Sequence, residues 1–381
     1  MKYKLEDLFD LQMGKTPARN NPEYWNSADN KWLSIGDLSK CGKYITNTKE
    51  YLSDTAVEES GISLIPENTV VMSFKLSIGK TAITSEPMYS NEAIMSFRDK
   101  HVVPILPDYL YYMFLAKDWD EGTNKAVMGK TLNKATLAKV TIDVHSPTEQ
   151  RKIVDTLDKV ASVIDARRQQ LSALDELIKA RFVEMFGTFP SNEKGWLTGT
   201  IRDLVTEVRY GSSRKAAEGD SGKYPYLRMN NITYSGELDL SDTKTIDIPD
   251  EELDKCTVRR GDLLFNRTNS KELVGKTCVY NRDELMVLAG FVVRVRLNEK
   301  ALPEFVSAFM NTTFSKQMLL GMCKAAIGQA NINAQELQNI GIYIPPIELQ
   351  REFVSFKEQI DKSKFLMINH QAQTHLIENL R

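Results

Sequence analysis

Residues 147–186 read PTEQRKIVDTLDKVASVIDARRQQLSALDELIKARFVEMF, and the organisation of the whole chain can be developed from this stretch. Its apolar side chains recur at alternating steps of three and four, with one polar interruption at Arg167. That spacing is typical of a helix that pairs with another helix. No Gly or Pro follows Pro147, and Pro is tolerated in the first turn of a helix. The stretch therefore predicts one helix of about forty residues and roughly 60 Å.

A second stretch near the end of the chain has the same design. Residues 345–351, PPIELQR, echo residues 147–151, PTEQR, and a similar apolar seam follows them. A rod of this length cannot bury its seam against itself, so we expect the two helices to pair antiparallel. The alternative is two unrelated amphipathic helices on separate cores. The expected interface comprises Ile153, Leu157, Val160, Ile164, Leu171, Leu174 and Ile178 on the first helix and Phe353, Phe356, Ile360, Met367 and Ile377 on the second.

The residues that precede each helix form an internal repeat. Strands are expected at residues 32–38, 70–74 and 80–84, and a short helix at Pro107–Ala116, with counterparts in the same order in residues 187–345. Gly79 recurs as Gly275, and Pro107 recurs as Pro303. Order and spacing that persist over many landmarks indicate a tandem duplication of a domain plus a helix.

The sequence thus predicts an α+β protein. Two tandem α/β domains are separated by two long antiparallel helices, which form a coiled coil with pseudo-two-fold symmetry. The expected boundaries are a first domain over residues 1–146, a central spacer helix over 147–186, a second domain over 187–345 and a C-terminal spacer helix over 346–381.

Composition bounds the class of protein. The chain has 381 residues, 42% of them hydrophobic and 26% charged, as in soluble globular proteins, and it has neither a membrane-spanning run nor a signal peptide pattern. Its four cysteines are scattered, which fits a cytoplasmic location. The net charge of −2 argues against a nucleic-acid partner, but acidic residues gather in 235–254 and basic residues in 255–300. Such segregation can create a basic face on a neutral protein.

Motifs for catalysis are not apparent. Four Gly-Lys-Thr triplets occur, but none has the earlier Gly that a phosphate-binding loop requires. The four histidines share no metal-binding spacing, and no glycine-rich turn for S-adenosylmethionine or a dinucleotide follows a strand. We therefore expect no catalytic residues, no metal site and no cofactor in this chain.

Polar loops at matching landmarks of the two repeats are the strongest candidate site. Arg pairs with guanine, Asn and Gln pair with adenine, and Lys and Ser hold phosphates, so these loops predict DNA binding. An ordinary role as turn and surface residues is the alternative for each. The candidates are Lys15, Thr16, Arg19, Asn20, Ser73, Lys75, Lys130 and Asn133 in the first repeat, and Arg209, Tyr210, Ser212, Ser213, Arg214, Lys215, Arg228, Asn230, Asn266, Arg267, Asn269, Gln329, Asn331 and Asn333 in the second.

The chain resembles the specificity (S) subunits of Type I restriction-modification enzymes over its whole length. The resemblance is carried by the P-x-E-Q-R start of the first rod, its variant in residues 346–351, the Gly-Asp-Leu-Leu of 261–264 and the Gly-Gln-Ala-Asn-Ile-Asn of 328–333. The first repeat departs from the pattern, with Glu-Asn-Thr-Val at 67–70 and no Gln in its 129–133 loop.

This resemblance implies a non-catalytic subunit with two target recognition domains, each of which reads one half of a bipartite double-stranded DNA site. The helix pair would set the spacer and dock two modification subunits, which bind S-adenosylmethionine and methylate adenine N6. Two restriction subunits, using ATP and Mg²⁺, would complete the nuclease. The alternatives from the residues alone are a coiled-coil scaffold that binds proteins without DNA readout, and a self-contained methyltransferase or nuclease.

Overall fold

The computed structural model describes residues 1–75, 77–119, 124–126, 129–219, 221–323 and 330–378, and for 124–126, 129–131 and 369–378 it describes the backbone alone. The chain forms two compact units, Met1–Ala166 and Arg167–Arg381, and the division falls inside one helix, α7 (Pro147–Phe186). That helix has the bounds expected from the sequence, because nothing interrupts its hydrogen-bond ladder between Pro147 and Gly187. The mixed α/β class with tandem domains is confirmed. The finer boundaries at 146, 186 and 345 stay a prediction.

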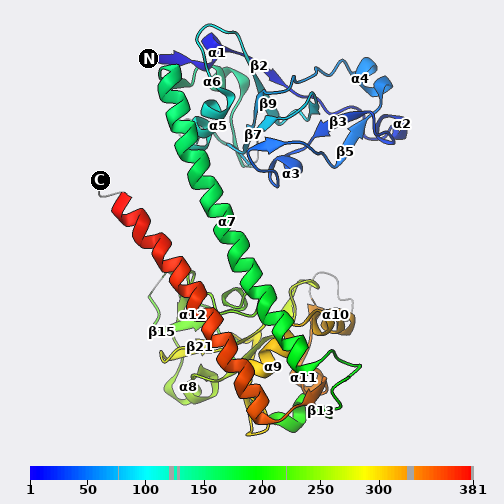
Figure 1. Ribbon diagram of the computed structural model, residues 1–381, viewed down its shortest axis with the longest axis vertical. Helices are drawn as coiled ribbons and strands as arrows, with labels where there is room; N and C mark the ends of the chain where they lie inside the picture. The colour runs from blue at the N-terminus through cyan, green and yellow to red at the C-terminus, as the bar shows by residue number, and fades with distance from the viewer. Residues whose placement is uncertain (76, 120–123, 127–128, 220, 324–329, 379–381) are drawn as a thin grey trace. The chain divides into compact units, whose positions relative to one another are not determined.

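The first unit is built on a five-stranded sheet in the order β2-β9-β6-β7-β4, beside a three-stranded sheet β5-β3-β8. Helices α5 and α6 lie at the end of the unit that meets α7, and α2 and α4 lie at the opposite end (Figure 1). Phe97, Phe114 and Trp119 pack edge to face in the main core. The strands are β1 (Lys2–Lys4), β2 (Phe9–Met13), β3 (Asn30–Leu33), β4 (Tyr44–Ile45), β5 (Glu50–Leu52), β6 (Val70–Ser73), β7 (Thr81–Thr84), β8 (Tyr89–Ser90), β9 (Ile94–Asp99), β10 (Asn124–Ala126), β11 (Gly129–Thr131) and β12 (Thr141–Asp143), and the helices before α7 are α1 (Leu5–Leu8), α2 (Pro22–Trp25), α3 (Ile35–Leu38), α4 (Asp54–Ser60), α5 (Pro107–Ala116) and α6 (Lys134–Ala138).

The second unit repeats this plan. Its main sheet has the order β14-β22-β18-β20, and a second sheet has the order β16-β15-β21-β17. Its core is rich in aromatic rings, with Phe305 and Phe309 of α9 against Tyr343 of β24. The strands are β13 (Leu197–Thr200), β14 (Val205–Tyr210), β15 (Tyr224–Leu227), β16 (Lys244–Ile246), β17 (Thr257–Val258), β18 (Leu263–Asn266), β19 (Thr268–Asn269), β20 (Thr277–Val279), β21 (Met286–Leu288), β22 (Val292–Leu297), β23 (Ala330–Asn331) and β24 (Gly341–Ile344), and the helices are η1 (Ile201–Leu204), η2 (Met229–Asn231), α8 (Asp250–Cys256), α9 (Pro303–Met310), α10 (Thr313–Met322), α11 (Ala334–Gln338) and α12 (Ile347–Glu378).

One buried glutamine occupies the same place in both units and explains the Gln-Arg that the starts of the two long helices share. The amide oxygen of Gln150 accepts from Leu106 N at 2.9 Å, and its nitrogen donates to two backbone carbonyls, those of Pro104 and His145. Gln350 makes the same three bonds, to Leu302 N, Lys300 O and Pro345 O. Both glutamines are 0% exposed. This glutamine clasp ties the start of each long helix to the segment before α5 or α9.

The Gly-Asp-Leu-Leu motif also has a structural explanation. Gly261 has a φ of +90°, a region that favours glycine, and Asp262 accepts from Arg259 N at 2.9 Å. In the first repeat Asn68 takes the place of Gly261 with a φ of +56°, and asparagine tolerates this conformation better than most residues. The departure in the first repeat therefore preserves the turn.

Within the second unit, the end of α7 packs against the start of α12 (Figure 1). Phe182 lies against Phe353 with ring centroids 5.3 Å apart, and Arg181 pairs with Glu352 at 3.0 Å. Nearer the middle of α7, Asp175 pairs with Lys364 at 2.5 Å, so the two helices run in opposite directions. Phe182 and Phe186 carry much of this contact, and neither was among the expected interface residues.

Of the expected interface residues, Phe353 is buried and Ile178 packs on the core of the second unit. Leu171, Leu174, Phe356, Ile360 and Met367 are half-buried in the same unit. In the first unit Ile153 and Ile164 are half-buried, and Leu157 and Val160 are exposed. The side chain of Ile377 lies outside the described residues. The interface set as a whole stays a prediction.

The strand expected over residues 32–38 is wrong in its second half. The strand β3 ends at Leu33, and Ile35–Leu38 forms the short helix α3. The cause is local, because Ser34 caps the helix and Asp37 accepts from Ser34 N, which is a capping box. This capping box is visible in the sequence as the pattern Ser34-x-x-Asp37. None of the helices in the described part of the chain is long and apolar enough to cross a membrane.

Candidate nucleic-acid interface

Most polar loops of the second unit leave its main sheet at one edge. Strands β14 and β18 are both antiparallel to β22, so they point the same way and end at the same edge. Backbone bonds hold the loops together there. Gly211 N donates to Val292 O, Arg267 N donates to Phe291 O at 3.0 Å, and Ile332 N donates to Arg267 O at 2.9 Å. We call this edge, formed by residues 211–215, 266–275 and 330–333, the loop edge of the second unit.

Three of the sequence candidates meet at this edge. The guanidinium carbon of Arg267 lies 4.9 Å from the ring centroid of Tyr210, and its Nε donates to Asn331 Oδ1 at 3.2 Å. Thr268 also donates to Asn331 Oδ1, and the hydroxyl of Tyr210 accepts from Ala334 N at 3.0 Å. The ring and the amide therefore fix the plane of the Arg267 guanidinium.

Other candidates at this edge serve the loops themselves. Asn266 is 0% exposed and, with its amide oriented to satisfy its neighbours, donates to Thr268 O and accepts from Asn269. Ser212 is buried and accepts from Arg214 N, and Asn333 caps α11 by accepting from Gln335 N and Glu336 N. These side chains shape the loops through the hydrogen bonds that they make.

Two candidate arginines are paired with carboxylates. Arg214 holds Glu252 with both Nε and Nη2, at 3.2 and 2.7 Å. Arg228 donates from Nη2 to both the carbonyl and a carboxylate oxygen of Asp242. Their guanidinium groups are thus occupied by residues from the acidic segment 235–254. Ser213, Lys215 and Asn230 are exposed, Asn269 is half-buried, and Gln329 lies outside the described residues.

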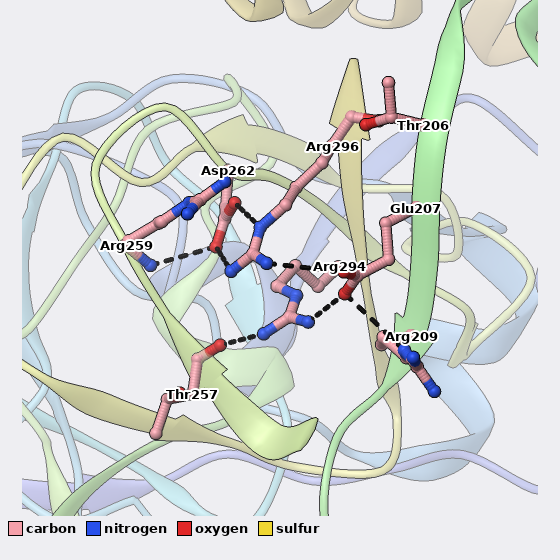
Figure 2. Close-up of polar contacts among 8 residues, drawn as sticks. All are labelled: Thr206, Glu207, Arg209, Thr257, Arg259, Asp262, Arg294 and Arg296. Atoms are coloured by element: carbon pink, nitrogen blue, oxygen red, sulfur yellow. Dashed lines mark hydrogen bonds and ion pairs between the residues drawn. The ribbon is translucent and has the colours of Figure 1, made fainter. Parts of the chain in front are cut away.

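Arg209 lies on β14 at the border of a charged network that was not predicted from the sequence (Figure 2). Arg294 of β22 is 2% exposed and pairs with Glu207, and Arg296 donates to Asp262 at 2.8 Å and to Glu207 at 3.4 Å. Burial alone would raise the pKa of Glu207, but the hydrogen bond from Arg294 and the three arginine charges outweigh it and lower that pKa. The network is structural, since it joins β14, β22 and the Gly-Asp turn.

The first unit has a corresponding loop edge, formed by the described residues 14–17, 73–75, 77–80, 90–93 and 132–133. Strands β2 and β6 are both antiparallel to β9 and end together. The backbone bonds match those of the second unit. Gly14 N donates to Ile94 O, Phe74 N donates to Ala93 O, and Leu132 N donates to Phe74 O at 3.1 Å. The duplication therefore places equivalent loops at equivalent edges.

Among the candidates of the first unit, some side chains bond to neighbouring residues, and others are exposed or half-buried. Arg19 pairs with Glu50 and stacks 3.7 Å from the centroid of Trp25 and 4.7 Å from that of Trp32. Ser73 is 0% exposed and donates to Ser77 O, so it holds its own loop. Thr16 donates to Glu92, Lys15 donates to Ser60 O, and Asn133 caps α6 by accepting from Thr136 N. Asn20 is exposed and Lys75 is half-buried, while the side chain of Lys130 lies outside the described residues.

A search of the described residues finds no group of three or more His, Cys, Asp or Glu side chains placed to hold a metal ion. Polar and basic groups at the ends of strands, supported by a packed sheet, can instead bind an extended polyanion through its phosphates and base edges. The two loop edges are therefore candidate nucleic-acid interfaces.

The chain belongs to the family described as Type I restriction modification DNA specificity domain. The family model matches residues 1–176 and 193–376. It is 26% identical over 264 residues to the Type I restriction enzyme MjaIX specificity subunit of Methanocaldococcus jannaschii, which covers 63% of this chain and 59% of that protein. It is 22% identical over 340 residues to the Type I restriction enzyme EcoKI specificity subunit of Escherichia coli, covering 84% of this chain and 73% of that one. The first match thus spans less than two thirds of that relative.

The fold agrees with this family. The chain superposes on the crystal structure of the S subunit of a Type I restriction-modification system from M. genitalium with a TM-score of 0.51 and 12% identity, over 100% of this chain and 94% of that chain. The sequence-based resemblance to specificity subunits is confirmed.

Proposed function

We propose that this protein is the DNA-recognition subunit of a Type I restriction-modification system, with each unit reading one half of a bipartite duplex site. One observation carries the proposal, namely that a chain of the specificity family presents equivalent polar loops at equivalent edges of two duplicated units. The alternative of a protein-binding scaffold would be favoured by polar loops dispersed over the surface. Within each unit the loops instead gather at one edge.

Arg267 is the residue best placed to read a base. Its Nε is used by Asn331 and its face by Tyr210, whereas neither terminal nitrogen bonds to any other described residue. A planar fork with two available N–H groups matches O6 and N7 of guanine. Arg228 differs, because its Nη2 is committed to Asp242.

Catalysis would belong to other chains. On this proposal two modification subunits dock on the long helices, bind S-adenosylmethionine and methylate adenine N6 after flipping the base out of the helix. Two restriction subunits, which use ATP and Mg²⁺, would add cleavage. The family membership and the relatives named as specificity subunits of restriction enzymes support this assembly.

The test is DNA binding by the chain purified together with its methyltransferase partner. Mapping of methylated adenines in the host genome supplies the bipartite site, and a duplex with both half-sites scrambled is the control. We expect specific binding whose affinity falls steeply with salt, because phosphate contacts release counterions. Absence of specific binding with the partner present, or binding that does not respond to salt, would refute the proposal.

Two matched variants then test the assignment of Arg267. Arg267→Ala should weaken binding by about 1–3 kcal/mol and relax specificity at one position of one half-site, because one bidentate contact to a base is lost. Arg228→Ala should leave base preference unchanged, since Arg228 is held by Asp242. A uniform loss of affinity over all sequences in Arg267→Ala would assign Arg267 to a phosphate instead.

A further inference from the structure

The second unit contains a pocket of about 460 Å³, lined by several lysines, that extends beyond its loop edge, the main candidate site. It lies between the later part of α7, helix α10 and the chain on either side of Tyr234 and Lys271. Three lysines line it, namely Lys179 from α7, Lys271 from the connection after β19, and Lys316 from α10. Glu272 is the one carboxylate among the described residues of its wall, so the lining keeps an excess of positive charge.

Lys316 is the unusual member of this group. Its Nζ is shielded from solvent and has no hydrogen-bond partner among the described residues, although it lies 4.7 Å from the ring centroid of Tyr234. Burial, and then the charges of Lys276 and Lys179, lower the pKa of Lys316 to about 8. At neutral pH the group is thus mostly an ammonium ion with no acceptor. Leaving such a group unpaired is costly, and an anion would remove the cost.

The neighbouring charges do not supply that anion. Lys179 already pairs with Glu176 at 2.8 Å on the exposed side of α7, and the buried Lys276 donates to Met229 O at 2.8 Å. Glu272 is exposed, and hydrogen bonds from its own backbone and from Ser270 lower its pKa. Its carboxylate is thus stabilised by groups of its own loop. The cation inside the pocket therefore faces mainly other cations.

Neutral donors complete the site. Thr313, the first residue of the ten-residue helix α10, lines the pocket together with Ser235 and Gln317. The start of a helix carries partial positive charge and backbone N–H groups without intrahelical partners. Ammonium groups, a hydroxyl and a helix start together suit a tetrahedral anion with several acceptor oxygens.

We propose that this pocket binds a phosphate group, and that the Lys316 ammonium, covered in this conformation, turns toward the anion and pairs with it. The phosphate can be an inorganic ion or a phosphodiester of bound DNA, since both present the same oxygens. Only the second source rests on the proposed function, because it requires DNA at the second unit. In that case the pocket would extend the contact surface from the loop edge to α10.

The experiment follows the Cε carbon of Lys316 by NMR in the full chain labelled with ¹³C-lysine, with the signal assigned by Lys316→Gln. In chloride buffer the titration midpoint should lie near 8. Inorganic phosphate at matched ionic strength should raise this midpoint by at least one unit, because the anion favours the ammonium form. A midpoint raised by inorganic phosphate supports a site for the free ion.

The second arm adds the bipartite duplex in chloride buffer, with the methyltransferase partner bound. A raised midpoint with DNA alone assigns the site to a backbone phosphate, and Lys316→Gln should then reduce the salt slope by about one without changing sequence preference. Lys255→Gln, which removes an exposed lysine of α8, is the matched control and should leave both readouts unchanged. If neither phosphate nor bound DNA moves the midpoint, the proposal is overturned. Failure of the wild-type protein to bind DNA would refute the proposed function while leaving the phosphate arm decisive.

Discussion

Replacement of Gln350 by leucine tests whether the glutamine clasp holds the long helix to its unit. Leucine is close to glutamine in volume, so the substitution opens little space. It removes one acceptor and two donors, however, and leaves Leu302 N, Lys300 O and Pro345 O without the partner that lies within 3.0 Å of each. The variant Gln150→Leu does the same in the first unit and serves as its matched control.

The magnitude follows from the three groups. A buried polar group that loses its partner costs about 1–3 kcal/mol, and the bonds to Leu302 N and Lys300 O are only partly buried. For three groups we therefore expect a loss of about 3–5 kcal/mol in the free energy of local opening, near the lower end of the range that the three costs give together. At about 1.4 kcal/mol per factor of ten, local opening should rise by roughly a hundred- to several-thousand-fold.

Hydrogen exchange followed by mass spectrometry measures this opening in each unit separately. In Gln350→Leu the amides of residues 298–306 and 343–352 should lose protection, while residues 102–110 and 143–152 keep it. The Gln150→Leu variant should show the reverse. Unchanged protection around Leu302 in Gln350→Leu would refute the clasp as the support of α12. Equal loosening of both units in either variant would refute its local character.

Three further predictions concern single side chains. Glu207→Gln should destabilise the second unit by about 3–5 kcal/mol in denaturant unfolding, because it leaves the buried Arg294 uncompensated, and the double change to methionine at both positions should recover most of the loss. Gly261→Ala should cost about 1–2 kcal/mol because of its positive φ, whereas Asn68→Gly should be close to neutral in the same assay. Because the folded pKa of Lys316, about 8, lies below the ordinary value of about 10.4, stability in phosphate-free buffer should rise as the pH increases between these values. Lys316→Met should abolish this rise, and a wild-type stability that is flat over the same range would contradict the assignment.

The long helix and the duplication could be predicted from the sequence because each rests on a pattern that tertiary structure does not easily override. A helical apolar spacing without any Gly or Pro after Pro147 predicted the bounds of α7 to the residue, and the matched landmarks predicted two units with similar, though not identical, sheets. The prediction of a strand over residues 32–38 was wrong in its second half. It extended a strand pattern through a capping box, so α3 was missed. The local signal at Ser34 was present and was weaker than the apolar run around it.

The candidate site was only partly predictable, because residue type does not reveal what a side chain already contacts. Asn266 and Ser212 have the chemistry of DNA-binding residues, but the fold buries them. Arg214 finds its carboxylate at Glu252, 38 positions away along the chain, and such a pair cannot be inferred from spacing. By contrast Arg267 is supported by Tyr210 and Asn331, and all three were candidates from the sequence.

The backbone bonds at the two loop edges have a consequence for how such a protein can change its target. In both units the loops are tied by main-chain atoms, as in Leu132 N to Phe74 O and Ile332 N to Arg267 O, although a phenylalanine in one unit corresponds to an arginine in the other. Main-chain ties survive almost any substitution that leaves the turn glycines in place. On the proposed function, the side chains of each loop edge can therefore change, and the DNA bases that they contact with them, while the backbone that presents them is kept.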